Sequence, residues 1–202
     1  MTDLRSELRG LPDIDFHLVL PPGWVRRGVD DDERDGLRAQ ARRTTMRAGR
    51  PDLFAQATQL IDGAFDRMRG TGAIAFFGAG EADDGLHVPA SLVASVRHAD
   101  ASGTLDEQVA VLIQRRGATP LHGDKRFVRW EQRGEETVQG TRLGVTTIAY
   151  LTPYPRSDRK RALLLSAFLT HDPDAPADDP PLEALRLLMD ATVSTLRWKR
   201  PQ

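Results

Sequence analysis

Arginine is the residue whose spacing first suggests a chemical role. Arg34, Arg38 and Arg42 recur at every fourth position, which places three guanidinium groups along one face of a helix. Guanidinium groups bind carboxylates and phosphates through paired hydrogen bonds, so this ridge could hold an acidic partner. The alternative is a solvated helix, because acidic residues crowd positions 30–35 and can pair with the arginines locally. No aromatic residue lies among the arginines of residues 26–50, which argues against binding of single-stranded nucleic acid.

Trp130 is the second candidate for a binding residue. It stands among charged residues that include Arg129 and Glu131, so the indole could lie exposed on a sheet face and anchor a partner. The alternative is that the indole packs beneath a helix. We predict that Arg38, Arg42, Arg129 and Trp130 contact a partner protein on a sheet face beside the arginine-rich helix.

Two histidines lie at the ends of predicted strands. His98 precedes Asp100, and His171 precedes Asp172 and Asp174. If both strand ends met at one sheet edge, their imidazole and carboxylate groups could hold a ligand or perform acid–base chemistry. The alternative is that these are ordinary loop residues, since aspartate is common in turns after strands. We predict no metal site and no cofactor.

The sequence lacks the usual signatures of catalysis. The chain has no cysteine, which removes thiol catalysis and cysteine-ligated metals. No serine lies in a Gly-x-Ser-x-Gly motif, which marks the nucleophile of many hydrolases. The glycines around residues 71 and 79 do not form a phosphate loop, because an acidic turn and a predicted strand follow Gly80 where such a loop needs a helix. We therefore expect a protein that is not an enzyme.

Composition places the chain among ordinary globular proteins. It has 202 residues, 28 Lys plus Arg, 29 Asp plus Glu and a net charge of −1, which fits one domain spanning residues 1–202. The balanced charge gives no overall attraction to nucleic acid or anionic membranes. No apolar stretch approaches the roughly 20 residues of a membrane helix, and residues 1–11 lack the pattern of a secretory signal. We expect a cytoplasmic location, without membrane insertion and without a nucleic-acid partner.

Capping residues and hydrophobic periodicity predict the elements that must position these side chains. Helices are expected at 30–49, 52–68, 104–116 and 182–196. The third has the clearest ends, since Thr104 and Glu107 have capping-box spacing and Gly117 follows the last turn. Strands are expected at 15–20, 73–79, 86–98, 119–121, 126–132, 142–151 and 161–171, with a proline-rich loop at 172–181. This order predicts an α+β fold, an α/β/α sandwich whose mostly antiparallel sheet has about six or seven strands.

The two ends of the predicted fold carry short motifs. The opening strand ends in a turn within the run Phe16-His17-Leu18-Val19-Leu20-Pro21-Pro22-Gly23-Trp24. The tail holds a strand at 162–169, a loop and a last helix that ends Ser194-Thr195-Leu196-Arg197-Trp198. This arrangement resembles the PsbP-like family of α/β/α sandwiches, which includes LpqN-type proteins and secretion-associated chaperones. The resemblance implies that the last helix packs across the sheet, that an aromatic residue then returns to the core, and that residues 30–69 are a two-helix insertion.

These observations favour a non-enzymatic protein-interaction module, either an adaptor or a secretion-type chaperone, with a protein partner. Two alternatives stay open. One is a small-ligand-binding protein or enzyme that uses the His98 and His171 clusters at one sheet edge, which requires the two histidines to converge. The other is a structural subunit of a larger assembly, which predicts a large exposed apolar patch.

Overall fold

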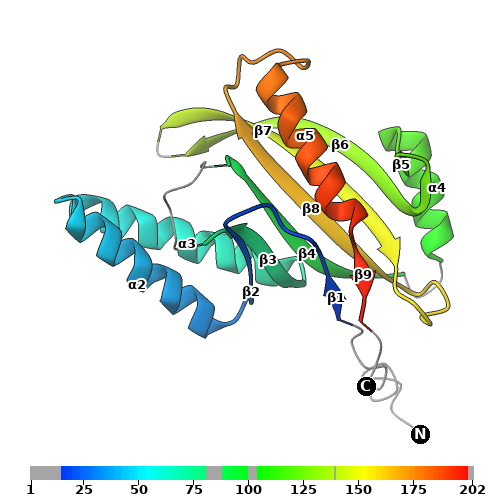
Figure 1. Cartoon of the computed structure of the whole chain (residues 1–202), viewed down its shortest axis with the longest axis horizontal. Helices are drawn as coiled ribbons and strands as arrows, with labels where there is room; N and C mark the ends of the chain where they lie inside the picture. The colour runs from blue at the N-terminus through cyan, green and yellow to red at the C-terminus, as the bar shows by residue number, and fades with distance from the viewer. Residues whose placement is uncertain (1–14, 81–87, 100–103, 139, 200–202) are drawn as a thin grey trace, which may run out of the picture.

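The architecture is a seven-stranded sheet with helices on both faces (Figure 1). The computed structural model describes residues 15–80, 88–99, 104–138 and 140–199. Within them the helices are α2 (Asp31–Arg47), α3 (Asp52–Gly70), α4 (Leu105–Arg116) and α5 (Pro180–Ser194). The strands are β1 (Phe16–His17), β2 (Trp24–Arg27), β3 (Ala73–Ala79), β4 (Ala90–His98), β5 (Thr119–Leu121), β6 (Asp124–Val138), β7 (Thr141–Pro153), β8 (Arg161–His171) and β9 (Arg197–Trp198).

The main sheet has the strand order β2-β3-β4-β8-β7-β6-β5. Each neighbouring pair is antiparallel. Strand β8 lies at the centre, and β2 and β5 form the two edges. The predicted α+β class, with a mostly antiparallel sheet of six or seven strands, is therefore confirmed.

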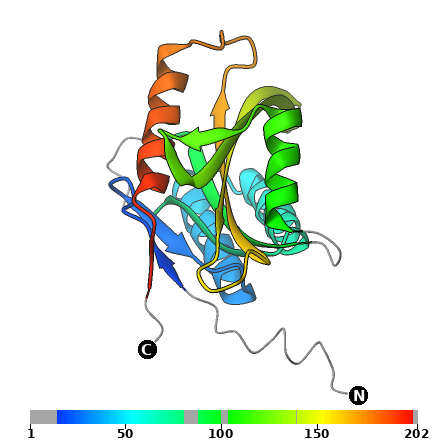
Figure 2. The same ribbon diagram turned by 90° about the vertical axis from the view of Figure 1, so that its right-hand side faces the viewer.

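The sequence of β8 explains why helices lie on both faces of the sheet. Leu163, Leu165 and Leu169 belong to the main core beneath α5, whereas Ala162 and Leu164 belong to a smaller cluster beneath α4. Successive strand residues point to opposite faces, so an uninterrupted apolar run needs cover on each side. Figure 2 shows α5 on one side of the sheet and α4 on the other.

Helices α2 and α3 form a pair beside the β3 end of the sheet (Figure 1). Helix α2 begins where the Asp30 carboxylate accepts the Glu33 N–H at 2.9 Å. Helix α3 packs on the sheet through Phe65, whose ring meets that of Phe76 edge-on with centroids 5.8 Å apart. Two helices thus form where the sequence predicts them.

The two-stranded ribbon of β1 and β9 joins the ends of the described chain. Phe16 pairs with Trp198, and the ring centroids of Trp198 and Tyr154 are 4.8 Å apart. Helix α5 crosses the sheet and Trp198 then packs against the main core. The tail therefore follows the path that the resemblance implies.

The first predicted strand is too long, and one strand was missed. Of residues 15–20 only Phe16–His17 is a strand, although Phe16 is buried and His17 exposed as expected. The missed strand is β2, which pairs with β3 along the sheet edge. Its four residues, with two arginines, gain main-chain hydrogen bonds from one neighbour without the apolar alternation by which a strand is detected in sequence.

Other boundaries move by a few residues. Strand β4 begins at Ala90, and residues 86–87 of the predicted strand lie outside the described residues. Strands β6 and β7 extend beyond their predicted ends. Helix α5 begins at Pro180, inside the predicted loop, and ends at Ser194, because proline is accepted in the first turn of a helix. None of the described helices has the length and apolar character needed to cross a membrane.

Candidate functional site

Helix α4 is fixed over one face of the sheet by its two ends. At its start the Thr104 hydroxyl accepts the Glu107 N–H and the Glu107 carboxylate accepts the Thr104 N–H, each at 3.3 Å. At its end Gly117 has a left-handed backbone, with φ +62°, which glycine adopts without strain. Leu105 in the first turn is buried against the sheet. The capping box and terminal glycine predicted from the sequence are confirmed.

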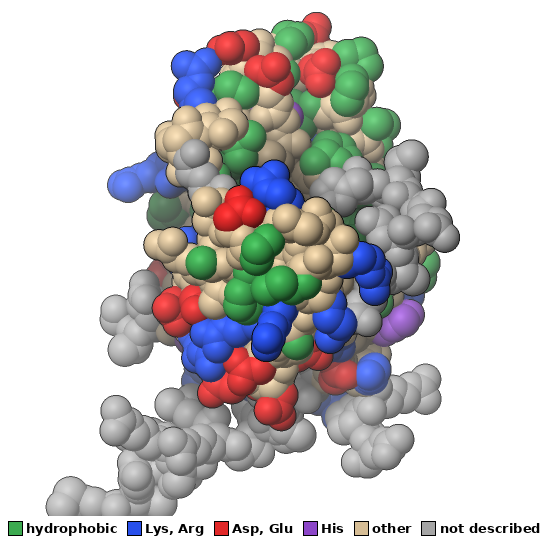
Figure 3. All heavy atoms as spheres, turned by 90° about the vertical axis from the view of Figure 1, so that its left-hand side faces the viewer, with side chains coloured by type: hydrophobic (Ala, Val, Ile, Leu, Met, Phe, Trp, Pro, Cys, Tyr) green, Lys and Arg blue, Asp and Glu red, His purple; other side chains and the backbone are tan. Residues whose placement is uncertain are grey.

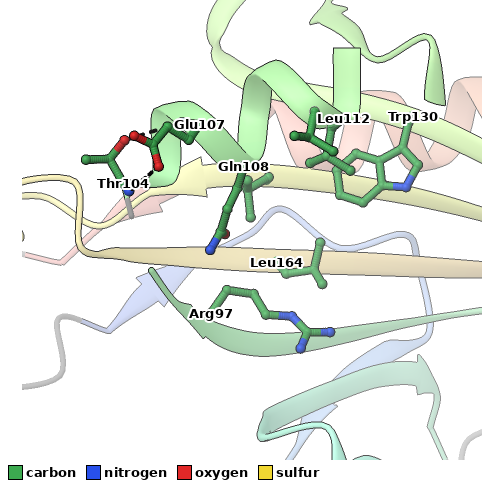
Figure 4. A pocket seen from close by; sticks show the side chains of 9 residues that line it. Arg97, Thr104, Glu107, Gln108, Leu112, Trp130 and Leu164 are labelled. Atoms are coloured by element: carbon green, nitrogen blue, oxygen red, sulfur yellow. Dashed lines mark hydrogen bonds between the residues drawn. The ribbon is translucent and has the colours of Figure 1, made fainter. Parts of the chain in front are cut away.

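A cavity of about 530 Å³ opens between α4 and the sheet. In Figure 4, Gln108 points from α4 toward the sheet, Leu112 lies beside the indole of Trp130, and Arg97 extends from β4. The cavity is lined by Arg97, Thr104, Glu107, Gln108, Val111, Leu112, Trp130, Leu151 and Leu164. Mainly apolar walls with a few polar groups are typical of sites that bind small ligands or inserted side chains.

The strand register continues this site across the sheet. One row of side chains on this face runs through Phe76, Val93, Ser166, Ala149 and Trp130. Helix α3 covers the Phe76 end of the row, and α4 covers the Trp130 end. Val93 and Ser166, between them, remain half-buried. On this face none of the described helices lies over the part of the sheet that carries Val93 and Ser166, whereas α5 crosses the opposite face (Figure 1).

Phe168 marks the exposed centre of this surface. It lies on the central strand β8, paired with Ser91 on one side and Thr147 on the other, yet it is 37% exposed. We call the surface formed by Ser91, Val93, Thr147, Ser166 and Phe168 the open strip. An aromatic ring that stays partly exposed at the middle of a sheet is the kind of apolar surface that binding partners cover.

A polar cluster lies on the opposite face, beneath α5. The buried Asp190 carboxylate accepts the Tyr150 O–H at 2.6 Å and the Arg129 Nε–H at 2.9 Å. His122 Nε2 lies 3.7 Å from the second carboxylate oxygen. Burial and the hydrogen bond to Asp190 raise the pKa of Tyr150 far above its ordinary value, so the hydroxyl keeps its proton and remains a donor. These groups pair with one another, and the cluster ties α5 to the sheet.

Arg38 of the predicted arginine ridge is held within the protein. Its Nε and Nη2 lie 2.8 and 2.6 Å from Asp62 of α3, and its Nη1 lies 2.8 Å from Asp35. The hydrogen bond from Arg38 lowers the pKa of Asp62. Arg42 is exposed one turn further along. Figure 3 shows basic and acidic side chains next to one another on the end of the molecule that these helices form. Because Arg38 binds Asp62, part of the ridge joins α2 to α3.

The structure does not bring the four predicted contact residues onto one surface. Arg38 and Arg42 lie on α2. Arg129 points beneath α5, where it pairs with Asp190, and Trp130 points to the opposite face, where it is half-buried at the cavity under α4. Adjacent strand residues point to opposite sides of a sheet, so Arg129 and Trp130 cannot share a face. Of the four, Trp130 lies at the candidate site.

The two histidine clusters do not converge. His98 pairs with Arg161 at one end of β8, and His171 is the last residue at the other end of that strand. Ten residues of strand separate these ends, which corresponds to about 33 Å. Asp100 lies outside the described residues. Within the described part of the chain, no group of three or more His, Asp or Glu side chains is arranged to hold a metal ion.

The site contains residues that sequence reasoning did not select. Arg97 and Gln108 carry no motif, and Phe168 belongs to an apolar run that favours burial on both faces. These three residues lie at the site because α3 and α4 leave parts of the sheet uncovered. Which parts are uncovered follows from the order of the strands in the sheet. The capping signals of α4 could have located one wall of the site, but the strand that faces it could not be deduced from spacing.

The fold thus defines an α+β protein with one helix-covered sheet face and one partly open face. No protein-family model matches this chain, and comparison with curated proteins gave no match. Among solved structures, a mutant of the protein Mog1 is similar at 9% sequence identity and a TM-score of 0.39, over 61% of this chain and 78% of that one.

Proposed function

We propose that this protein is a non-enzymatic, cytoplasmic protein-interaction module that binds a helical segment of its partner on the open strip. The observation that carries the proposal is the spacing of the helices on that face. Strands β4, β8 and β7 separate β3 from β6, so the centres of β3 and β6 lie four strand spacings apart, about 19 Å. Packed helices lie about 8–10 Å apart. Among the described helices, α3 lies over β3, and α4 extends from Leu151 and Leu164 to Trp130 of β6. Space for one more helix therefore remains over the end of β4, β8 and β7 that carries the open strip.

The chemistry of the open strip suits a helix with an apolar face. Phe168 and Val93 offer apolar contact, while Ser91, Thr147 and Ser166 are small enough to let a helix approach closely. The opposite face of the sheet is already covered by α5 over the main core. The resemblance to PsbP-like proteins, which include secretion-associated chaperones, supports a role in holding a partner segment. An adaptor or chaperone of this kind needs no catalytic group.

Affinity purification from the native host, followed by mass spectrometry, tests this proposal. The Phe168→Asp variant places a charge at the centre of the open strip, and we expect recovery of the specific partner to fall at least about tenfold, because an uncompensated charge is costly to bury. The matched control is Leu187→Asp, since Leu187 is 61% exposed on α5 at the opposite face. That variant should retain the partner.

A second variant separates loss of binding from loss of folding. Ser166→Arg adds a large side chain to the same strip, and circular dichroism with thermal unfolding establishes whether each variant is folded. If folded Phe168→Asp and Ser166→Arg proteins recovered the same partners as the unmodified chain, the open strip would not be the binding surface.

A further inference from the structure

We propose that the cavity between α4 and the sheet binds a small carboxylic acid with an apolar body. This site goes beyond the proposed function, because it takes a small molecule in a cavity beside the open strip, whereas the partner helix would lie on the strip itself. It also uses neither histidine: Arg97 directly precedes His98 in β4, but adjacent strand residues point to opposite faces of the sheet.

The size and walls of the cavity fit such a ligand. Its volume is about 530 Å³, within the range of about 300–1,000 Å³ that small-molecule sites occupy. Leu151 and Leu164 contribute apolar side chains from the sheet, and Leu112 and the indole of Trp130 lie together at one end (Figure 4). These side chains would surround the apolar body and remove it from water.

Arg97 supplies the group that selects an acid. It is an exposed residue of β4 and lines the cavity; the described residues provide it with no ion pair. An unpaired guanidinium next to apolar walls can bind a carboxylate through two parallel hydrogen bonds. Gln108 points toward the same space from α4 (Figure 4) and adds an amide that can donate or accept.

Within the described chain, Glu107 is the other charged residue that lines the cavity, and its carboxylate forms no ion pair with Arg97. The Glu107 carboxylate accepts the Thr104 N–H within the capping box at 3.3 Å. The negative charge of Glu107 also repels a second anionic group on the ligand, which limits the ligand to one carboxylate. The chemistry therefore favours a monocarboxylate over a polyanion such as a nucleotide.

Three probes of matched size test this assignment: 4-phenylbutyrate, 4-phenylbutanol and 4-phenylbutylamine. Calorimetry gives their affinities, and the NMR signals of the Trp130 indole N–H and the Gln108 amide report where they bind. We expect the carboxylate to bind at least about tenfold more tightly than the alcohol or the amine, because it alone gains a charge-assisted hydrogen bond. Equal affinities of the acid and the amine would refute the proposal, as would the absence of any binding.

Arg97→Gln is the decisive variant. Because Arg97 is exposed, the chain should fold normally, and we expect the preference for the acid over the alcohol to disappear. The control is Arg47→Gln, which removes an exposed arginine of α2 and should leave the affinity unchanged. Retention of acid binding by Arg97→Gln, or shifts confined to signals outside the cavity, would show that the site lies elsewhere. Partner recovery by Phe168→Asp is measured separately, so failure of one proposal does not imply failure of the other.

Discussion

At the scale of single residues, the buried carboxylate of Asp190 fixes α5 to the sheet. One of its oxygens accepts hydrogen bonds from both Tyr150 and Arg129. The Asp190 side chain is 9% exposed and that of Arg129 is 20% exposed. Water can therefore supply few hydrogen bonds to either group if its partner is removed. A buried charge that loses its partner destabilises a protein far more than a pair on the surface.

Replacing this carboxylate should weaken the fold. Asp190→Asn keeps the size of the side chain but removes the nearer of the two carboxylates that the described residues place beside Arg129, and the 3.3 Å contact to Glu131 remains. We expect a loss of about 2–3 kcal/mol in the free energy of unfolding, and about 1 kcal/mol for Tyr150→Phe, which removes one neutral donor. Urea denaturation measures both. Unfolding of Asp190→Asn at the same midpoint as the unmodified chain would contradict this account.

The sequence indicated which arginines could bind an acidic group, but it did not indicate which carboxylates they bind. The sequence identifies Arg38 and Arg129 as cations that could bind an acidic group, and the structure gives each one a carboxylate of its own chain, Asp62 and Asp190. Those carboxylates lie 24 and 61 positions further along the chain. Such distant pairings depend on how helices and strands pack together, which local spacing does not encode.

At the scale of elements, α4 shows that capping residues can predict where a helix begins and ends. Its start and end follow from Thr104, Glu107 and Gly117, whose roles act within one turn of the helix. Strand β2 shows the opposite case, since its four residues gain their structure from pairing with β3. Elements with their own caps and periodicity were therefore predictable, and an edge strand defined by its neighbour was not.

The capping box of α4 gives a prediction at this scale. Thr104→Ala removes the hydroxyl that accepts the Glu107 N–H, and we expect the free energy of unfolding to fall by about 1 kcal/mol. Thr104→Ser keeps the acceptor and should cost much less. Thermal unfolding of the two variants checks the difference. Equal destabilisation by alanine and serine would mean that the methyl group, and not the cap, carries the effect.

At the scale of the whole molecule, Asp15 joins segments that are far apart in the sequence. Its carboxylate lies 2.6 Å from Lys199 Nζ and 2.8 Å from Arg26 Nη1, and its backbone oxygen accepts the Lys199 N–H at 2.7 Å. These contacts link the start of the described chain, the edge strand β2 and the residue after β9. Nothing in the spacing of Asp15 and Lys199 reveals that they meet, because their contact depends on the path of the complete fold.

This junction predicts how stability depends on pH. Partial burial opposes ionisation of Asp15, but hydrogen bonds from Lys199 and Arg26 outweigh it and hold the pKa at about 2, below the ordinary value of 3.8. A carboxyl whose pKa is lower in the folded state stabilises the fold above its unfolded pKa, and this contribution is lost as the pH falls from about 4 to about 2. Because the side chain is 41% exposed, solvent screening limits the contribution to about 1 kcal/mol.

The variant Asp15→Asn removes this contribution at every pH. Urea denaturation at pH 7 should show it to be less stable than the unmodified chain, and the difference should shrink steadily as the pH is lowered from 5 to 3. Asp66→Asn is the control for removing a carboxylate at another position, since Asp66 is exposed on α3, and it should have little effect on stability at pH 7. A difference for Asp15→Asn that stayed constant from pH 7 to pH 3 would mean that the negative charge of Asp15 does not hold the two ends of the fold together.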